Sequence, residues 1–312
     1  MSRVRVIHGW KNLAASDRGA AVAMGNFDGI HRGHQKVIAL AAEAARELAC
    51  PLGVITLDPH PRVYHRPHEP AFQLMKRDQQ ARALEALGVD ILYVLPYGEL
   101  AEVSDRDFAA RVLHEGLGVR HVALGFDNSY GKDRTGTPES MRQYGKELGF
   151  GVSVAAEVTD VHGEKFSSTA VREALREGRP DEAARILGRP FAIEGEVQRG
   201  RQLGRKLGYP TANVGLDDYV VPKFGVYATR TRLPDGRKLP GVANIGVNPT
   251  VDGVIEPRLE VWLFDFDEDI YDQVIETDLA HFLRPELKFD SLDAMVVQID
   301  ADVREAKAKL GV

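Results

Sequence analysis

The chain has 312 residues, about two domains' worth at a typical ~150 residues per domain. Hydrophobic residues make up 44% and charged residues 28%, a balance typical of globular proteins that excludes a disordered chain. The 40 Lys and Arg residues are outnumbered by 46 Asp and Glu residues, and the net charge of −6 argues against charge-driven binding to nucleic acid or anionic lipid. We therefore expect small-molecule partners, with no nucleic acid and no membrane.

The N-terminal residues lack the apolar core of a signal peptide, and no stretch approaches the ~18 uninterrupted apolar residues of a membrane span. The single cysteine, Cys50, follows an apolar helical run, and we expect it to be a small core residue. One cysteine excludes an intrachain disulfide and a zinc site built on several thiolates. We expect a cytoplasmic protein that is a monomer or a weak homo-oligomer.

Short apolar runs alternate with helix-period segments in the first half of the chain. Strands are predicted at 20–24, 53–57, 91–95, 121–124 and 152–155, and helices at 35–49, 78–87, 104–113 and 138–148. Repeated strand–helix units predict an α/β fold with a parallel sheet covered by helices on both faces.

The period changes near residue 187, after two short helices predicted at 169–177 and 181–187. Strands are predicted beyond it at 191–197, 226–233 and 258–265, with a hairpin turn at 234–236. Short strands between Gly and Pro turns indicate a small β-barrel, which a closing amphipathic helix at 291–310 follows. We place the domains at 1–187 and 188–312.

The first chemical motif lies between the first predicted strand and its helix. It comprises Gly25, Asn26, Phe27, Asp28, His31, Gly33 and His34. Ligands of doubly wound sheets bind at the carboxyl ends of strands, and a helix N-terminus offers N–H groups to an anion. These features favour a phosphate site over a solvated loop. A metal site made of Asp28 and the two histidines is the less favoured alternative, because the sequence shows no further residue that would support the metal ligands.

A second group of donors lies at a predicted helix start, where Ser168 and Thr169 are followed one turn later by Arg172. Hydroxyls, free N–H groups and the guanidinium can converge there on one anion. Plain N-capping followed by a solvated arginine is the alternative, and the two interpretations are compatible.

The segment 200–213 opens the predicted barrel and combines glycines with basic residues. Gly200, Gly204 and Arg205 suit a loop over phosphates, and Thr211 and Asn213 present oxygens to one side for a hard cation. An RNA-contacting loop or a merely solvated one is the alternative, but no aromatic platform for stacked bases accompanies the segment.

These motifs resemble known families. The His-x-Gly-His at 31–34 resembles the signature of Rossmann-like nucleotidyltransferases, and the string from Gly25 to His34 is similar to the form found in bacterial FAD synthetases. The segment 200–213 is similar to the Gly-x-x-x-Gly-Arg-x-x-Gly-Phe-Pro-Thr-Ala-Asn motif of riboflavin kinases. Nearly the whole chain, in one order, thus resembles the bifunctional riboflavin kinase/FMN adenylyltransferases of bacteria.

The resemblance implies a Rossmann-like nucleotidyltransferase domain followed by a riboflavin kinase-like barrel, and it implies roles for residues in both. His31, His34 and Arg172 would be catalytic for adenylyl transfer. The residues that would bind ATP are Gly25, Asn26, Phe27, Asp28, Gly33, Ser168 and Thr169. Flavin contacts would come from His60, Asp127, Tyr130 and Arg284, ATP phosphate contacts in the kinase from Gly200, Gly204 and Arg205, and Mg²⁺ ligands from Thr211 and Asn213.

Glu260 is the base that the resemblance implies for the kinase, where an alcohol must lose its proton. The alternative is an exposed strand glutamate. The sequence departs from the family pattern at four positions: Asn128, Tyr130, Trp262 and Asp272. The first two replace usual phenylalanines, the third a frequent histidine and the fourth a usual glycine.

The leading hypothesis is an enzyme that makes FMN from riboflavin and ATP, and then FAD from FMN and ATP with release of pyrophosphate. Both steps would need Mg²⁺, with ATP as co-substrate and flavins as substrate and product. One alternative is an active kinase whose N-terminal domain only binds a nucleotide or flavin. A weaker alternative is a transferase for another phosphorylated metabolite.

Overall fold

The computed structural model describes residues 4–159, 163–199, 209–249 and 255–312. Packing divides the chain into two units, Met1–Glu69 with Arg77–Phe166, and Pro70–Lys76 with Ser167–Val312. The helices α7 (Ser168–Arg176) and α8 (Pro180–Leu187) therefore pack within the second unit. The domain boundary at residue 187 stays a prediction.

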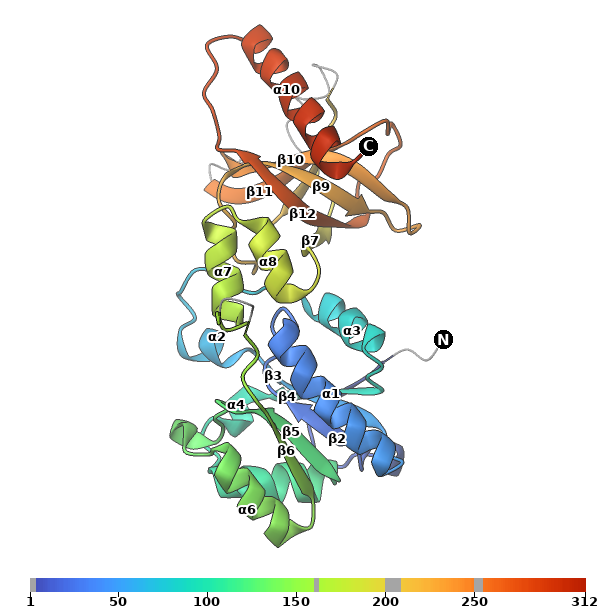
Figure 1. Cartoon of the computed structure of the whole chain (residues 1–312), viewed down its shortest axis with the longest axis vertical. Coiled ribbons are helices and arrows are strands. Elements are labelled where there is room, and N and C mark those ends of the chain that lie inside the picture. The colour runs from blue at the N-terminus through green and yellow to red at the C-terminus, as the bar shows by residue number, and fades with distance from the viewer. Residues whose placement is uncertain (1–3, 160–162, 200–208, 250–254) are drawn as a thin grey trace. The chain divides into compact units, whose positions relative to one another are not determined.

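The first unit contains a six-stranded parallel sheet with the strand order β1-β4-β3-β2-β5-β6 (Figure 1). Its strands are β1 (Arg5–His8), β2 (Ala21–Met24), β3 (Leu52–Asp58), β4 (Ile91–Pro96), β5 (His121–Gly125) and β6 (Gly151–Ala155). This confirms the predicted Rossmann-like architecture. The edge strand β1 was not predicted, since its exposed residues form no apolar run.

Helices cover both faces of this sheet. α1 (Arg32–Glu47) packs against β2 and β5, where the small residues Ala21 and Ala23 let the helix approach closely (Figure 1). Met24 and Leu124 belong to the core of the other face, with the π-helix η2 (Phe108–Leu117) and α6 (Pro138–Leu148). The remaining short helices are η1 (Ala15–Asp17), α2 (Pro61–His65), α3 (Arg77–Ala86), α4 (Tyr97–Leu100), α5 (Asp105–Asp107) and η3 (Lys132–Arg134).

The order of the strands places a topological switch point between β2 and β5. From β2 the chain proceeds through β3 to β4 on one side, and it then returns to β5 on the other side. The loops that follow Met24 and Gly125 leave the sheet at this point, where open α/β sheets bind ligands. The Asn128 amide joins the two loops, because Nδ2 donates to the Met24 carbonyl oxygen at 3.3 Å.

The second unit contains a six-stranded antiparallel sheet with the order β7-β12-β9-β10-β11-β8. The strands are β7 (Phe191–Glu196), β8 (Ala212–Gly215), β9 (Gly225–Arg232), β10 (Lys238–Pro249), β11 (Ile255–Leu263) and β12 (Val274–Arg284). The segment after β7 bridges back to β8, where Gln198 N–H donates to the Asn213 carbonyl at 2.8 Å. The sheet is therefore nearly closed, which confirms the predicted barrel.

Among the described residues, the C-terminal helix α10 (Leu292–Leu310) is most deeply buried in its last turns. Ala306 and Leu310 are buried against Phe264. At the other end of the same predicted apolar face, the side chain of Leu292 is 64% exposed. The sequence periodicity is thus right about the helix, whose apolar face is buried at its C-terminal end and half-buried or exposed towards its N-terminal end. No helix in the described ranges is long and apolar enough to cross a membrane.

Candidate active sites

The loop after β2 has an unusual backbone and is packed into the protein. Phe27, Gly29 and Ile30 all have positive φ, at 51°, 86° and 46°. Only glycine adopts such angles without strain, so the surrounding structure must hold this loop in place. His31 is 7% exposed and Phe27 only 1% exposed. The alternative of a solvated histidine loop therefore does not describe His31.

His31 and His34 form a stacked pair at the N-terminus of α1. Their ring centroids are 3.6 Å apart, and Phe27 lies edge-on to His34 at 5.1 Å. His31 caps the helix, since its Nδ1 accepts the His34 N–H at 3.3 Å. Because Nδ1 is an acceptor, the proton of the neutral ring is on Nε2, which can donate to an anion.

The atoms around position 33 leave room only for glycine. A β-carbon there would lie 3.0 Å from the His31 ring and 3.3 Å from the carbonyl oxygen of Phe166. Any larger residue would displace the histidine ring. The Gly33 contact also places Phe166, the last residue of the first unit, beside the histidine motif.

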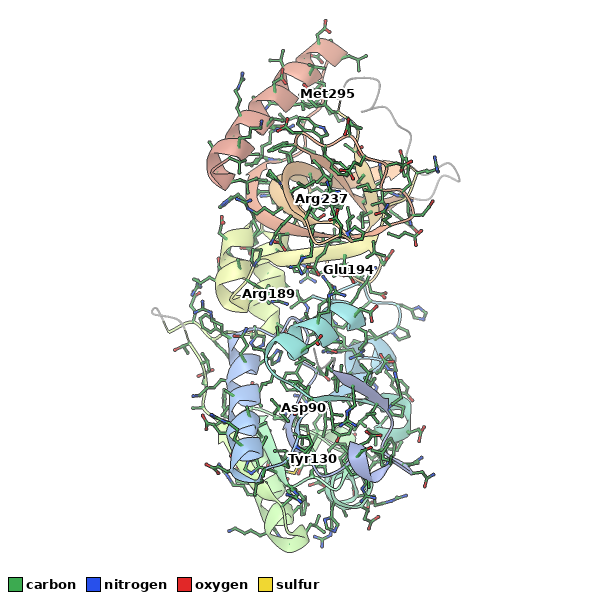
Figure 2. All side chains as sticks on the ribbon, turned by 90° about the vertical axis from the view of Figure 1, so that its right-hand side faces the viewer. Asp90, Tyr130, Arg189, Glu194, Arg237 and Met295 are labelled. Carbon is green, nitrogen blue, oxygen red and sulfur yellow. The ribbon has the colours of Figure 1, made fainter. Side chains whose placement is uncertain are left out.

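The side chains of the segment after β5 lie in different environments. Asp127 is exposed and pairs with Lys165, whose Nζ lies 4.7 Å from the Phe126 ring centroid. Tyr130, in contrast, lies inside the first unit (Figure 2), packed on Phe108 with its hydroxyl 3.0 Å from Ser140 Oγ. Burial raises the pKa of Tyr130 to about 12. The predicted flavin contacts of Asp127 and Tyr130 stay predictions.

A cluster of rings lies beyond the carboxyl ends of β3 and β4. Tyr64 and Tyr97 are 5.2 Å apart, and His65 Nε2 is 2.8 Å from the Tyr97 hydroxyl. Tyr64 is 46% exposed, so part of its side chain is accessible to solvent. His60 caps the short helix α2, with Nδ1 accepting the Arg62 N–H at 3.1 Å. Sequence reasoning missed the two tyrosines, because only the fold brings them together.

At the start of α7 the capping interpretation is confirmed. Ser167 Oγ accepts the Ala170 N–H at 3.1 Å, which places Ser168 and Thr169 in the first turn. Arg172 is 8% exposed, and its Nε donates to the Phe72 carbonyl at 2.7 Å. It is thus a buried arginine rather than a solvated one. The roles of Ser168, Thr169 and Arg172 in adenylyl transfer stay predictions.

In the barrel, strand register aligns three polar residues in one row. Glu260 of β11 pairs with Asn213 of β8 on one side and with Asn244 of β10 on the other. Residues directly opposite in an antiparallel ladder share a face, with β-carbons about 4.5–5.5 Å apart. Asn213 is 8% exposed, and its Nδ2 donates to the Thr211 carbonyl at 3.3 Å. The predicted base and the predicted cation ligand are therefore neighbours.

The row extends to a second carboxylate that sequence reasoning did not select. Asn244 Nδ2 donates to Glu286 Oε1 at 3.3 Å. A β-carbon at Gly246 would lie 2.1 Å from the same oxygen, so only glycine leaves room for the carboxylate. The other predicted phosphate contacts of the kinase, Gly200, Gly204 and Arg205, lie outside the described residues.

Arg284 joins the last strand of the barrel to α10. Its Nε and Nη2 donate to the carboxylate of Asp302, a residue only 4% exposed, at 2.7–3.1 Å. The predicted contact of Arg284 with flavin stays a prediction. Asp272, which replaces a usual glycine, still adopts a positive φ of 61°, a conformation that aspartate tolerates. Trp262 packs edge-on against Tyr209 at 5.0 Å.

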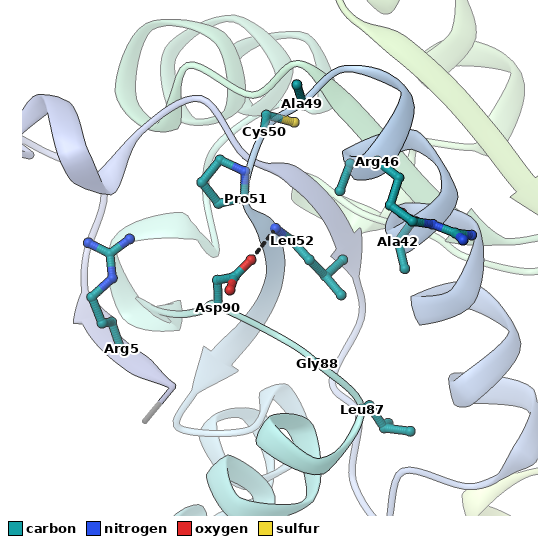
Figure 3. Close-up of a pocket in the computed structure, with 11 residues that line it drawn as sticks. Arg5, Ala42, Arg46, Ala49, Cys50, Pro51, Leu52, Leu87, Gly88 and Asp90 are labelled. Atoms are coloured by element: carbon teal, nitrogen blue, oxygen red, sulfur yellow. Dashed lines mark hydrogen bonds between the residues drawn. The ribbon is translucent and has the colours of Figure 1, made fainter. Parts of the chain in front are cut away.

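One surface hollow lies at the amino ends of β3 and β4 (Figure 3). It has a volume of about 750 Å³, and Arg5, Arg46, Cys50 and Asp90 contribute to its wall. Asp90 accepts the Leu52 N–H at 2.9 Å. Cys50 is half-buried on this wall, so the prediction of a core cysteine is wrong. The hollow contains none of the predicted site residues and lies at the opposite edge of the sheet.

The described residues contain no cluster of three or more His, Cys, Asp or Glu side chains arranged around a metal. The alternative of a metal site at Asp28, His31 and His34 therefore gains no support. The parallel sheet with its histidine motif and the antiparallel barrel with its carboxylate row define a class of two-domain enzyme, a nucleotidyltransferase-type domain combined with a kinase-type barrel.

The comparisons with known proteins agree for each half. The FAD synthetase family model matches residues 13–170, and the riboflavin kinase family model matches residues 187–310. A Pseudomonas fluorescens protein named bifunctional riboflavin kinase/FMN adenylyltransferase is 42% identical over 306 residues, 98% of this chain and 97% of that protein. A protein of the same name from Bacillus subtilis is 36% identical over 313 residues, with 98% and 97% coverage. The chain belongs to the bifunctional riboflavin kinase/FMN adenylyltransferase family.

A solved structure shows the same fold over nearly the whole length. It is a Streptococcus pneumoniae protein described as a macrolide-efflux protein, with a TM-score of 0.87 and 32% identity. The match covers 97% of this chain and 99% of that one. The similarity to that structure concerns the fold. The assignment of the chemistry of this chain rests on the two family models.

Proposed function

We propose that the histidine motif and the carboxylate row are the centres of two separate reactions on one chain. The chain is a transferase of flavin-cofactor biosynthesis that phosphorylates riboflavin to FMN with ATP and then adenylylates FMN to FAD, with release of pyrophosphate. The observation that supports this proposal most is that each unit has its cluster of polar residues at the position of the matching family motif. A binding module without catalysis is not favoured, because both histidines of the motif are present and ordered. His31 caps α1, and its ring stacks on that of His34.

In adenylyl transfer the phosphate of FMN attacks the α-phosphorus of ATP, and the bond to pyrophosphate breaks. A phosphate is already ionised near neutral pH, so this step needs charge stabilisation rather than a base. His31 Nε2–H and the N–H groups at the start of α1 would donate to the phosphate oxygens, with His34 beside them. Asn26, Phe27 and Asp28, with Gly25 and Gly33, form the surrounding loop. Ser168, Thr169 and Arg172 are proposed to add further donors.

In the kinase reaction Glu260 would take the proton of the terminal ribityl hydroxyl while the oxygen attacks the γ-phosphorus of ATP and ADP leaves. Thr211 and Asn213 would hold Mg²⁺, a hard cation that prefers oxygen ligands. The residues fit, since a buried asparagine beside a glutamate offers oxygen donors and no thiolate or imidazole. The ion would neutralise phosphate charge. Gly200, Gly204 and Arg205 are proposed to cover the phosphates.

For flavin binding in the first unit, the predicted contacts are His60, Asp127 and Tyr130, and the structure offers two supporting features. The exposed side chain of Tyr64 beside Tyr97 suits contact with an aromatic ring system. Asn128 Oδ1 is buried and accepts no hydrogen bond within the described residues, which leaves it for a ligand donor. In the barrel, Arg284 is the predicted flavin contact.

We further propose that the protein acts in the cytoplasm as a monomer or weak homo-oligomer without nucleic acid, and that its domains divide at residue 187. The net charge of −6 supports the absence of nucleic acid. The two family models leave residues 171–186 between them, which is compatible with that boundary. Light scattering of the purified chain and expression of 1–187 and 188–312 separately test these points.

The function is tested by incubating the purified chain with Mg²⁺, ATP and either riboflavin or FMN, and by separating the flavins chromatographically. We expect FMN and FAD from riboflavin, and FAD with equimolar pyrophosphate from FMN. Absence of FAD and pyrophosphate in the second mixture, with FMN still formed in the first, would favour the binding-module alternative.

A further inference from the structure

The strained loop after β2 rests on one buried side chain from α3. Gln80 is 5% exposed, and its Nε2 donates to the carbonyl oxygens of Asn26 at 3.1 Å and Phe27 at 3.3 Å. One amide group therefore holds two successive peptide units of the predicted phosphate-binding loop. Thr56 Oγ1 donates to the same Asn26 carbonyl at 3.0 Å, so this peptide is held from two elements.

The Gln80 amide is itself oriented by a neighbour one turn earlier on α3. Arg77 Nη1 donates to Gln80 Oε1 at 2.5 Å, while Nη2 donates to Asp58 Oδ1 at 3.1 Å. Because a guanidinium only donates, the oxygen of the Gln80 amide must face Arg77 and its nitrogen must face the loop. The chain Asp58–Arg77–Gln80 thus fixes the direction of both loop hydrogen bonds.

Peptide geometry gives this contact a consequence on the other side of the loop. In a planar trans peptide the C=O and N–H bonds point in opposite directions. With the carbonyls of Asn26 and Phe27 held by Gln80, the N–H groups of Phe27 and Asp28 are directed away from α3. The positive φ of Phe27, 51°, is a strained conformation that persists only where contacts enforce it.

We propose that Gln80 is a positioning residue for adenylyl transfer. It anchors the loop carbonyls so that the N–H groups of Phe27 and Asp28 are presented to the phosphates of ATP as the bond to pyrophosphate breaks. Gln80 does not touch substrate and acts only through the loop. The inference rests on the proposed role of residues 25–34 in binding ATP phosphates.

The experiment uses the full chain and measures both reactions in one preparation. Gln80→Leu keeps the size of the side chain and removes its donor, whereas Gln80→Asn keeps an amide, with donor and acceptor, on a side chain one methylene shorter. Gln143→Leu, an exposed glutamine on α6, is the matched control. We expect Gln80→Leu to lower kcat for FAD formation about tenfold to a hundredfold, with KM for FMN and the kinase kcat unchanged. Gln80→Asn should lose less than Gln80→Leu, and Gln143→Leu should behave as wild type.

Arg77→Met provides a second arm should Gln80→Leu fail to fold, because it leaves Gln80 in place and removes only its orienting partner. We expect a smaller decrease in the same kcat. FAD kinetics within twofold of wild type for either folded variant would overturn the proposal. A loss as large for Gln80→Asn as for Gln80→Leu, in proportion to lost thermal stability, would overturn it as well.

His31→Asn separates this inference from the function on which it rests. If His31→Asn abolishes FAD formation while Gln80→Leu leaves it intact, only the positioning role fails. If His31→Asn leaves FAD formation intact, the proposed phosphate site itself fails, whatever Gln80 does.

Discussion

Glu260 lies directly opposite Asn213 across the β8–β11 ladder of the barrel. Side chains alternate between the two faces of a strand, so a register slip of one residue would place them on opposite faces. Leu259 and Val261, which flank the glutamate, are fully buried in the barrel interior and make such a slip costly. The hydrophobic pattern of β11 thus holds the proposed base beside the proposed Mg²⁺ ligand.

Glu260→Gln should lower kcat for FMN formation by about 10²–10⁴, because the glutamine cannot accept the ribityl proton. Glu256→Gln, an exposed position on the same face of β11, is the matched control and should retain the rate. Phosphorylation of riboflavin and adenylylation of FMN are measured separately. Equal kinase rates for Glu260→Gln and Glu256→Gln would contradict the role of Glu260.

Arg284→Ala should destabilise the barrel by about 3–5 kcal/mol, because it leaves the carboxylate of Asp302 buried without its guanidinium. Arg284→Lys should lose less, since it keeps one charge. Urea unfolding followed by tryptophan fluorescence measures the free energy of unfolding. If Arg284→Ala left stability unchanged and raised only the KM for riboflavin, Arg284 would be a flavin contact and not a structural one.

Tyr130→Phe removes a single hydrogen bond, to Ser140, and leaves the ring in the core. We expect the free energy of unfolding to fall by about 1 kcal/mol, with KM for FMN unchanged. Steady-state kinetics and denaturation of the same preparation provide both numbers. An increase in KM for FMN without loss of stability would instead support the predicted flavin contact.

His121 predicts how the stability of the first unit depends on pH. Burial lowers the pKa of this histidine, and its Nε2 lies 2.8 Å from Ser153 Oγ. The unfolded chain, with an ordinary pKa near 6.5, therefore binds a proton more readily than the folded one. The free energy of unfolding should fall as the pH decreases below about 6.5 towards the lowered pKa of His121. Above pH 6.5 this histidine should not affect stability.

The comparison of wild type with His121→Gln between pH 5 and 8 isolates this contribution. The variant should lose less stability than wild type on acidification, and His114→Gln, an exposed position, should follow wild type. Parallel pH profiles for wild type and His121→Gln would show that this histidine does not contribute.

The sequence predicted the elements that have a strong period or a clear cap. The apolar run of β2 and the helical period of α6 are local signals, and the structure places both within one residue of the expected bounds. β1 and β12 were missed because their residues are exposed or mixed, and their strand character comes from pairing with neighbours.

The chemistry was predictable where one motif holds it and not where the fold assembles it. The proximity of His31 and His34 follows from their spacing at a helix start. The pairing of Glu260 with Asn213, the ring cluster of Tyr64 and Tyr97, and the support of the loop by Gln80 depend on residues far apart in the sequence. Only strand order and packing bring these together.

The most direct test of two independent centres on one chain measures both reactions for His31→Asn and Glu260→Gln. Asparagine can keep the helix cap at position 31 while removing the imidazole. We predict that His31→Asn lowers the rate of FAD formation by a factor of at least about 10² and leaves the rate of FMN formation unchanged. Glu260→Gln should do the reverse. If either folded variant lost both reactions to the same extent, the account of two separate sites would be wrong.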